Sequence, residues 1–102
     1  MRIIPEPLSF EWDKGNITKN LDKHNVTVHE SEEVFSNEPF VIAEDVEHST
    51  SKEQRFEALG KTRGNRKLFV SFTIRKNKVR VISIRDMSKK EVVTYASIEK
   101  NS

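Results

Sequence analysis

A chain of 102 residues can form one hydrophobic core but not two, so we expect a single domain spanning 1–102. Charged residues account for 33% and hydrophobic residues for 34% of it, with 3 Gly and 3 Pro, which excludes a disordered or low-complexity chain. The sequence contains no cysteine, which excludes disulfides and thiolate metal sites, and no apolar run reaches the roughly 18 residues of a membrane helix. We therefore expect a soluble protein of the cytoplasm that makes no contact with a membrane.

The net charge of +2 hides a division of charge along the chain. Residues 25–51 carry seven acids and no Lys or Arg, whereas residues 52–90 carry thirteen bases and three acids. A basic region is suited to a polyanion such as nucleic acid, and an acidic region to a different partner. The alternative is that the two regions pair with each other or are simply solvated.

The N-terminal part of the chain predicts a short edge strand over 8–12 and then a helix over about 14–24. Asp13 is a good N-cap for this helix, and Lys14 lies in its first turn, where a cation is mildly unfavourable and gives a weak indication of function. One face of the helix carries Ile17, Leu21 and His24. That spacing favours a packing role for the histidine over a catalytic one.

A second, shorter helix is predicted directly afterwards. Thr27 and Glu30 have the spacing of a capping box, and the helix that they open should end near residue 35 or 36. The sequence Asn37-Glu38-Pro39 turns the chain into a brief strand over 40–43. A polar loop over 44–52 follows.

The second half of the chain predicts consecutive strands. Apolar, β-branched and aromatic residues are concentrated in three stretches, at 54–59, 68–75 and 78–85. Ser88 and Glu91 form another capping box before a last helix. Because consecutive hairpins require antiparallel pairing, we expect an α+β fold: an antiparallel β-sheet with two N-terminal helices packed against it and a C-terminal helix.

A turn at 76–77 predicts which side chains of the hairpin share a face. It places Arg75 opposite Lys78, and Thr73 opposite Arg80. These four polar side chains gather at one corner and suggest an anion site, on a face that continues with Phe69, Ile82 and Ile84. The other face is a core surface, carrying Leu68, Val70, Phe72, Ile74, Val79 and Val81, with Ser83 on the same side.

The candidate chemistry is phosphate chemistry. The three histidines lie on different predicted elements without metal-ligand spacing, and no Gly-rich phosphate loop occurs, so we expect neither a metal nor a cofactor. Arginines on a sheet can bind phosphate and can assist RNA cleavage in which a 2′-hydroxyl attacks the adjacent phosphate. Candidate base-stacking side chains are Trp12, Phe69 and Tyr95. The pattern alone does not separate cleavage from plain RNA binding.

Five short motifs, in order along the chain, resemble the BrnT family. They are FEWD at 10–13, LDKHNV at 21–26, EEVF at 32–35, EQRFEALG at 53–60 and RVISIRDMSKKE at 80–91. BrnT proteins are ribonuclease toxins of type II toxin–antitoxin pairs, similar in fold to RelE-type toxins. The resemblance spans about 10–95, nearly the whole chain.

This resemblance implies a bacterial cytoplasmic ribonuclease that works without a metal and inhibits translation. It also implies a cognate antitoxin similar to BrnA, with a ribbon–helix–helix DNA-binding part. The two proteins would form a heterotetramer and repress their own operon, with the antitoxin binding the operator DNA.

The residue pattern and the resemblance together give two sets of candidate site residues. The catalytic candidates are Arg80, Arg85, Arg55, Glu53 and His24, with Ser83 at a further matching position. The RNA-binding candidates are Lys14, Lys23, Thr73, Arg75 and Lys78. Asp86 and Met87 stand where the family usually has a basic residue and Ala, which places a carboxylate beside Arg85.

Each candidate has a structural alternative. Arg80 could be a solvated strand residue, Arg85 could pair with Asp86, and Glu53 could form an internal pair with Arg55. Two other functions also stay open for the whole protein. One is a non-catalytic RNA- or ribosome-binding module, and the other is a protein-interaction partner whose charges serve only its antitoxin.

Overall fold

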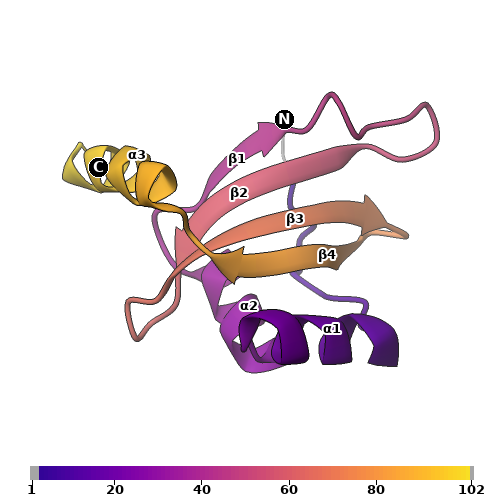
Figure 1. Ribbon diagram of the computed structural model, residues 1–102. Coiled ribbons are helices and arrows are strands. Elements are labelled where there is room, and N and C mark those ends of the chain that lie inside the picture. The colour runs from indigo at the N-terminus through magenta and orange to yellow at the C-terminus, as the bar shows by residue number, and fades with distance from the viewer. Residues whose placement is uncertain (1–2, 102) are drawn as a thin grey trace.

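Figure 1 shows the computed structural model, which describes residues 3–101. One antiparallel sheet has the strand order β1-β2-β3-β4, with β1 at Val41–Glu44, β2 at Arg55–Lys61, β3 at Lys67–Arg75 and β4 at Lys78–Asp86. The helices of the described chain are α1 (Lys14–His24), α2 (Val28–Ser36) and α3 (Lys89–Lys100). The predicted α+β class, with its antiparallel sheet, is confirmed.

The hydrophobic core lies between α2 and one face of the sheet. Side chains at alternate positions of the strands point to this face. Phe72 of β3 is fully buried there, with its ring centroid 5.1 Å from that of Phe35 on α2 and 5.4 Å from that of Phe56 on β2. In Figure 1, α1 and α2 lie together beside β3 and β4, whereas α3 lies near one end of the strands. α1 contacts β4, and α3 contacts β2.

The predicted helix boundaries are confirmed because local side chains satisfy the helix ends. Asp13 caps α1 by accepting a hydrogen bond from the Asn16 N–H, and Asn25 ends α1 in a left-handed conformation with φ of 55°. Both capping boxes are present, one at the start of α2 and the other at the start of α3. These signals are local, so the sequence alone was sufficient to find them.

The strand expected over 8–12 is wrong in extent. Phe10 forms only an isolated parallel bridge with Val79 at the start of β4. The Val79 N–H donates to the Ser9 carbonyl at 2.9 Å, and the Glu11 N–H donates to the Val79 carbonyl at 2.8 Å. This N-terminal arm, residues 9–13, therefore covers the free edge of β4 for a very short distance before α1 begins.

The hairpin register is confirmed at the turn but changes further along. Arg75 pairs with Lys78, Thr73 with Arg80 and Phe72 with Val81, as expected. A β-bulge then makes Ser71 pair with Ser83, so Ile82 has no partner in β3. The extra residue exchanges the two faces beyond it. Ile84 is consequently buried in the core, and the predictions that placed Ile84 on the polar face and Ser83 on the core side are wrong.

The predicted packing face of α1 is also wrong. Ile17 and Leu21 are exposed, at 36% and 44%, whereas Asn20 is buried. The Asn16 side-chain amide donates to the Val81 carbonyl at 2.9 Å, and the Asn20 side-chain oxygen accepts from the Ile84 N–H at 3.3 Å. β4 is an edge strand whose outward backbone groups need partners, and the two asparagines supply them. Hydrogen bonding rather than apolar burial therefore orients α1.

Candidate active site

An open pocket of about 240 Å³ lies between α1 and the sheet face that is opposite the core. We call it the arginine pocket, and its lining residues are Asn16, Lys19, Glu53, Arg55, Thr73, Arg75, Arg80 and Ile82. Five of the predicted site residues, Glu53, Arg55, Thr73, Arg75 and Arg80, thus come together. The lining contains four cationic side chains and one carboxylate, so the pocket is suited to an anion.

The floor of the pocket is a row of three residues across the sheet. Arg55 of β2 pairs with Thr73 of β3, which pairs with Arg80 of β4. Strand alternation directs this row away from Phe72 and the core. Thr73 is fully buried, and its hydroxyl donates to the Gln54 carbonyl at 2.7 Å. The threonine hydroxyl is thus occupied in fixing β3 to the start of β2, between the two arginines.

Arg80 is held by two carboxylates that the N-terminal arm supplies. Its Nη1 donates to Glu11 Oε1 at 2.9 Å, and its Nη2 donates to Asp13 Oδ2 at 2.6 Å. The other oxygen of Asp13 caps α1 through the Asn16 N–H at 2.8 Å. These bonds, first that from the Asn16 N–H and then that from Arg80, hold the pKa of Asp13 below its usual value. Asp13 therefore fixes the guanidinium of Arg80 relative to α1.

Glu53 is shared by the other two arginines of the pocket. Arg75 Nη2 donates to Glu53 Oε2 at 2.5 Å, and Arg55 Nε lies 3.4 Å from Glu53 Oε1. The hydrogen bond from Arg75 is the main cause that lowers the pKa of Glu53. The carboxyl group is therefore ionised at neutral pH and can accept a proton. The internal pair that was the structural alternative for Glu53 does form, and it forms inside the pocket.

Two lining residues, Asn16 and Lys19, were missed by the sequence analysis. Both lie on α1, three residues apart, and thus on one helix face. The apolar spacing of Ile17 and Leu21 drew attention to the wrong face of this helix. The sequence did contain a signal for the correct face of α1. Asn16 and Asn20 are four residues apart, so they share the side of the helix that faces the sheet.

The remaining predicted site residues lie outside the pocket lining. Arg85 stacks over the Phe69 ring at 4.1 Å, pairs with Glu91 at 2.8 Å and donates to the Asp86 carbonyl at 3.0 Å, so it connects β4 to α3. The glutamate raises the pKa of Arg85. The lysine candidates occupy exposed positions of α1 and of the start of β4: Lys14, Lys23 and Lys78. His24 is half-buried at the end of α1, and Ser83 lies across from Ser71.

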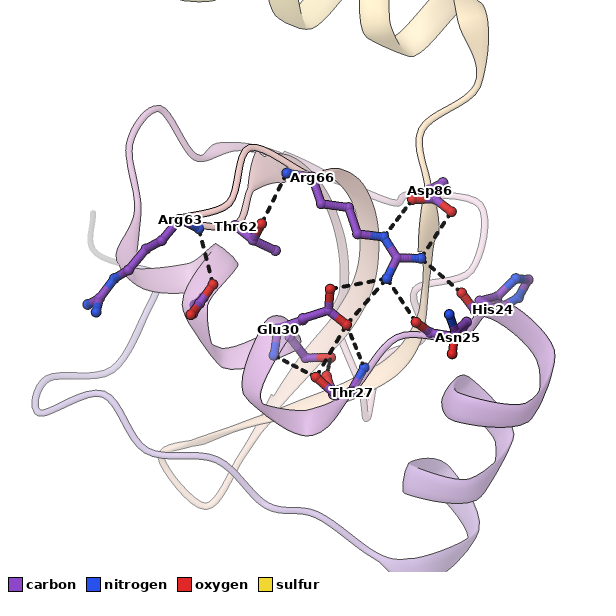
Figure 2. Close-up of polar contacts among 10 residues, drawn as sticks. His24, Asn25, Thr27, Glu30, Thr62, Arg63, Arg66 and Asp86 are labelled. Atoms are coloured by element: carbon purple, nitrogen blue, oxygen red, sulfur yellow. Dashed lines mark hydrogen bonds and ion pairs between the residues drawn. The ribbon is translucent and has the colours of Figure 1, made fainter.

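Asp86 belongs to a different cluster, organised by Arg66 (Figure 2). Arg66 Nε donates to Asp86 Oδ1 at 2.8 Å, and its Nη1 donates to Glu30 Oε2 at 3.1 Å. The same guanidinium donates to the carbonyls at the end of α1, those of His24 at 3.0 Å and Asn25 at 2.8 Å. The structural alternative in which Arg85 forms an ion pair with Asp86 is therefore wrong, because Arg66 binds that carboxylate.

The three aromatic side chains considered for base stacking have structural partners. The Trp12 indole donates to Glu32 at 2.8 Å and stacks with Phe10. Phe69 lies beneath Arg85, and the buried Tyr95 donates its hydroxyl to the Pro39 carbonyl at 2.5 Å. Burial raises the pKa of Tyr95 to about 12. All three therefore fasten the N-terminal arm or α3 to the rest of the fold.

A family model described as "Ribonuclease toxin, BrnT, of type II toxin-antitoxin system" matches residues 12–91. The chain belongs to the BrnT family. The match covers most of the chain and includes every residue that lines the arginine pocket. Membership of this family implies a ribonuclease toxin with an antitoxin as its partner. No curated relative matches the chain.

Two further properties bear on what this BrnT-family fold can bind. Within residues 3–101, no group of three or more His, Cys, Asp or Glu side chains is placed to hold a metal ion. No helix of the described chain is long and apolar enough to cross a membrane. The arginine pocket, which gathers five of the predicted site residues, is the candidate site in the part of the chain that the structure describes.

Proposed function

We propose that the arginine pocket is the site at which this BrnT-family toxin binds and cleaves RNA. The observation that carries the proposal is the convergence of Arg55, Arg75 and Arg80 with the ionised Glu53 in one open pocket. Guanidinium groups donate paired hydrogen bonds to phosphate oxygens, and a carboxylate can accept a proton. Phosphodiester cleavage requires both capabilities at neighbouring positions.

The proposed reaction needs no group beyond the pocket, the RNA and water. The 2′-hydroxyl of a ribose attacks the adjacent phosphorus, and its proton passes to the Glu53 carboxylate. The bond from phosphorus to the 5′-oxygen then breaks, and that oxygen takes a proton from water. The hydroxide that remains takes up the proton held by Glu53, which restores the carboxylate. The products are a 2′,3′-cyclic phosphate and a 5′-hydroxyl end. Arg55, Arg75 and Arg80 stabilise the extra negative charge that develops on the phosphate oxygens in the transition state.

The other candidate residues receive smaller roles in this proposal. The exposed Lys14, Lys23 and Lys78 contact flanking phosphates of the RNA by charge attraction. Arg85 positions α3 through Glu91, and His24 lies with the Arg66 cluster at the end of α1. We assign the reacting proton to Glu53 rather than to His24 because Glu53 lines the pocket.

We further propose the partners and the setting that the family resemblance implies. The toxin works in the bacterial cytoplasm and inhibits translation. A BrnA-like antitoxin with a ribbon–helix–helix part neutralises it in a heterotetramer, which binds operator DNA and represses the operon. The RelE-like fold relationship is part of the same proposal, supported by an antiparallel sheet that carries cationic side chains on one face.

The test is RNA cleavage by purified protein, comparing Arg80→Ala with the control Arg63→Ala. Arg63 has an exposed side chain on the β2–β3 loop (Figure 2) and is outside the pocket lining. We expect Arg80→Ala to slow cleavage by about 10²–10³-fold, and Arg63→Ala to retain activity. Cleaved ends are mapped for a cyclic phosphate. A folded Arg80→Ala protein with full activity would refute the proposal. Wild-type protein that binds RNA but leaves it intact would select the non-catalytic RNA-binding alternative.

A further inference from the structure

We propose that Lys19 of α1 is the residue that first captures an RNA phosphate in the arginine pocket. The inference rests on the proposed function of this pocket and adds a binding role for a residue that no sequence motif indicated. Lys19 lines the pocket from the side of the helix, across from the arginines of the sheet. Its chemical target is the negatively charged phosphodiester group of single-stranded RNA.

The pocket arginines already have carboxylate partners in the folded protein. Arg80 binds Glu11 and Asp13, and Arg75 binds Glu53, which also lies 3.4 Å from Arg55. An incoming phosphate must therefore share these guanidinium groups with a carboxylate or displace it. Lys19 is exposed and forms no ion pair with any other residue in 3–101. It can bind a phosphate without breaking an existing interaction.

The helix that carries Lys19 is fixed to the sheet on both sides of this residue. Asn16 bonds to the Val81 carbonyl, and Asn20 bonds to the Ile84 N–H. Asp13 caps the helix and also binds Arg80. The Cα of Lys19 thus has a set position above the pocket, while its long side chain can move to meet a ligand. This combination suits capture of a substrate that the more rigid guanidinium groups then position.

Lys23 extends the same surface along α1. Residues 16, 19 and 23 follow the spacing i, i+3 and i+7, so they share one side of the helix. The predicted RNA-binding Lys23 therefore follows Lys19 toward the end of the helix. A strand of RNA whose phosphate occupies the pocket could run along this side of α1, with its next phosphates near Lys23.

Phosphate capture by Lys19 and transition-state stabilisation by Arg80 predict different kinetic effects when each residue is replaced. Removal of a capture residue weakens RNA binding and raises KM, whereas removal of a guanidinium that acts in the transition state lowers kcat. The test uses purified Lys19→Ala, the conservative variant Lys19→Arg, and Lys90→Ala as a control. Lys90 is an exposed lysine on α3 and lies outside the pocket lining.

Binding is measured with a single-stranded RNA oligonucleotide carrying 2′-O-methyl groups, which cannot attack the phosphate. We expect Lys19→Ala to weaken binding by about tenfold at low salt, and to reduce the slope of log K against log salt by about 0.7. Lys19→Arg should restore most of the affinity, and Lys90→Ala should bind like wild type. On unmodified RNA, Lys19→Ala should raise KM more than it lowers kcat.

Two results would overturn the inference, and they differ in what they say about the pocket. If Lys19→Ala binds like Lys90→Ala while Arg80→Ala has lost cleavage, Lys19 is a solvated lysine and the proposed active site stands. If the wild-type protein neither binds nor cleaves RNA, both proposals fail together. Thermal unfolding checks each variant, and because Lys19 is exposed its replacement should leave Tm unchanged.

Discussion

Two clusters of arginine and carboxylate groups occupy opposite ends of α1, and they use the same chemistry differently. At the helix start, Arg80 binds Glu11 and Asp13 at the edge of an open pocket. At the helix end, Arg66 binds Glu30 and Asp86 and joins α1, α2 and β4 (Figure 2). Both arginines are mostly buried, with side-chain exposures of 23% and 25%.

The difference lies in how many donors each guanidinium has committed. Arginine has five N–H donors. Those of Arg66 are all directed at partners, because Nε binds Asp86 while Nη1 and Nη2 each reach one backbone carbonyl and one carboxylate. In Arg80, only Nη1 and Nη2 make bonds to other described residues. A saturated guanidinium stabilises the fold, whereas an unsaturated one beside a pocket retains donors for a ligand.

The difference between the two clusters is tested most directly at Glu53, the carboxylate within the pocket. If Glu53 accepts the proton, Glu53→Gln should slow RNA cleavage by about 10²–10⁴-fold. Binding of the 2′-O-methyl oligonucleotide should stay equal or become tighter, because Arg75 loses a competing carboxylate. Glu57→Gln is the matched control, since Glu57 lies four residues after Glu53, within β2, but outside the pocket lining. Wild-type activity in Glu53→Gln would make Glu53 only a partner of the arginines.

The pH dependence of cleavage separates Glu53 from His24 as the base. Because its pKa is lowered, Glu53 stays ionised down to pH values below its usual 4.5. The acidic limb of kcat/KM should therefore lie below pH 4.5. A histidine base would lose activity near pH 6.5, the ordinary pKa of that side chain. A limb in that higher range would assign the proton transfer to a histidine.

Arg66 should show the opposite behaviour from the pocket residues. Arg66→Met removes the bonds to two carboxylates and to the last carbonyls of α1, so we expect about 2 kcal/mol lower free energy of unfolding. For a domain of this size, that corresponds to a Tm lower by roughly 10 °C. RNA cleavage at 25 °C should be unchanged, because Arg66 lies outside the pocket lining. A stable but inactive Arg66→Met protein would contradict this assignment.

The dependence of unfolding stability on acidic pH provides a second test of the structural role of Arg66. The hydrogen bond from Arg66 lowers the pKa of Asp86, and bonds from Thr27 and Arg66 lower that of Glu30. A carboxyl group with a depressed pKa in the folded state contributes stability above its unfolded pKa, and this stability is lost as the pH falls through the folded pKa. Wild-type stability should thus decline as pH falls below about 4.5. The decline should be shallower in Arg66→Met, which has already lost those arginine contacts.

The fold was predictable wherever its signals were local. The helix caps, the capping boxes and the turn at 76–77 depend on residues close together in sequence. The bulge near Ile82 was not predictable, because one extra residue leaves no mark in an alternating apolar strand. The orientation of α1 was missed for a related reason. Its asparagines bond to an edge strand more than sixty residues later, and only the folded sheet shows which edge needs partners.

The site residues that lie on paired strands could be predicted from the sequence, but those brought in by α1 and by the N-terminal arm could not. Thr73 and Arg80 follow from the hairpin register alone. Arg55 joins them through the β2–β3 pairing, and Lys19 only through the packing of α1. The acidic partners of Arg80 come from the N-terminal arm, which was expected to be an ordinary strand. The resemblance made Arg85 a catalytic candidate, and its carboxylate partner belongs to α3, while the neighbouring Asp86 binds an arginine of the β2–β3 loop.

The acidic segment 25–51 also divides into bound and unbound charges. Glu30 binds Arg66, Glu32 binds Trp12, Glu33 accepts from the Arg63 N–H, and Asp45 binds His48. Of these four, Glu30 alone pairs with a cationic side chain of the basic region 52–90, so the alternative of pairing between the two regions is correct for that acid, whereas the partners of the other three are an indole, a backbone N–H and a histidine of the acidic segment itself. Glu44 and Glu47 are exposed and have no ion pair with other described residues. Together with Glu38, which is also exposed, they are the members of this segment whose charge is most available to a partner.

The smallest expected effect concerns those two residues and the antitoxin. A DNA-binding antitoxin must carry cationic groups, and exposed carboxylates on the toxin would attract them over a distance that shrinks with salt. We expect the double variant Glu44→Gln/Glu47→Gln to slow association with the antitoxin by about two- to fivefold at low salt, with RNA cleavage unchanged. Asp45 is left intact because it accepts bonds from both the backbone and the ring of His48. The association rate is measured by stopped flow at two salt concentrations for the variant and the wild type. Equal rates for variant and wild type at low salt would mean that the antitoxin approaches another surface, for which the arginine pocket with its cationic side chains is the first candidate.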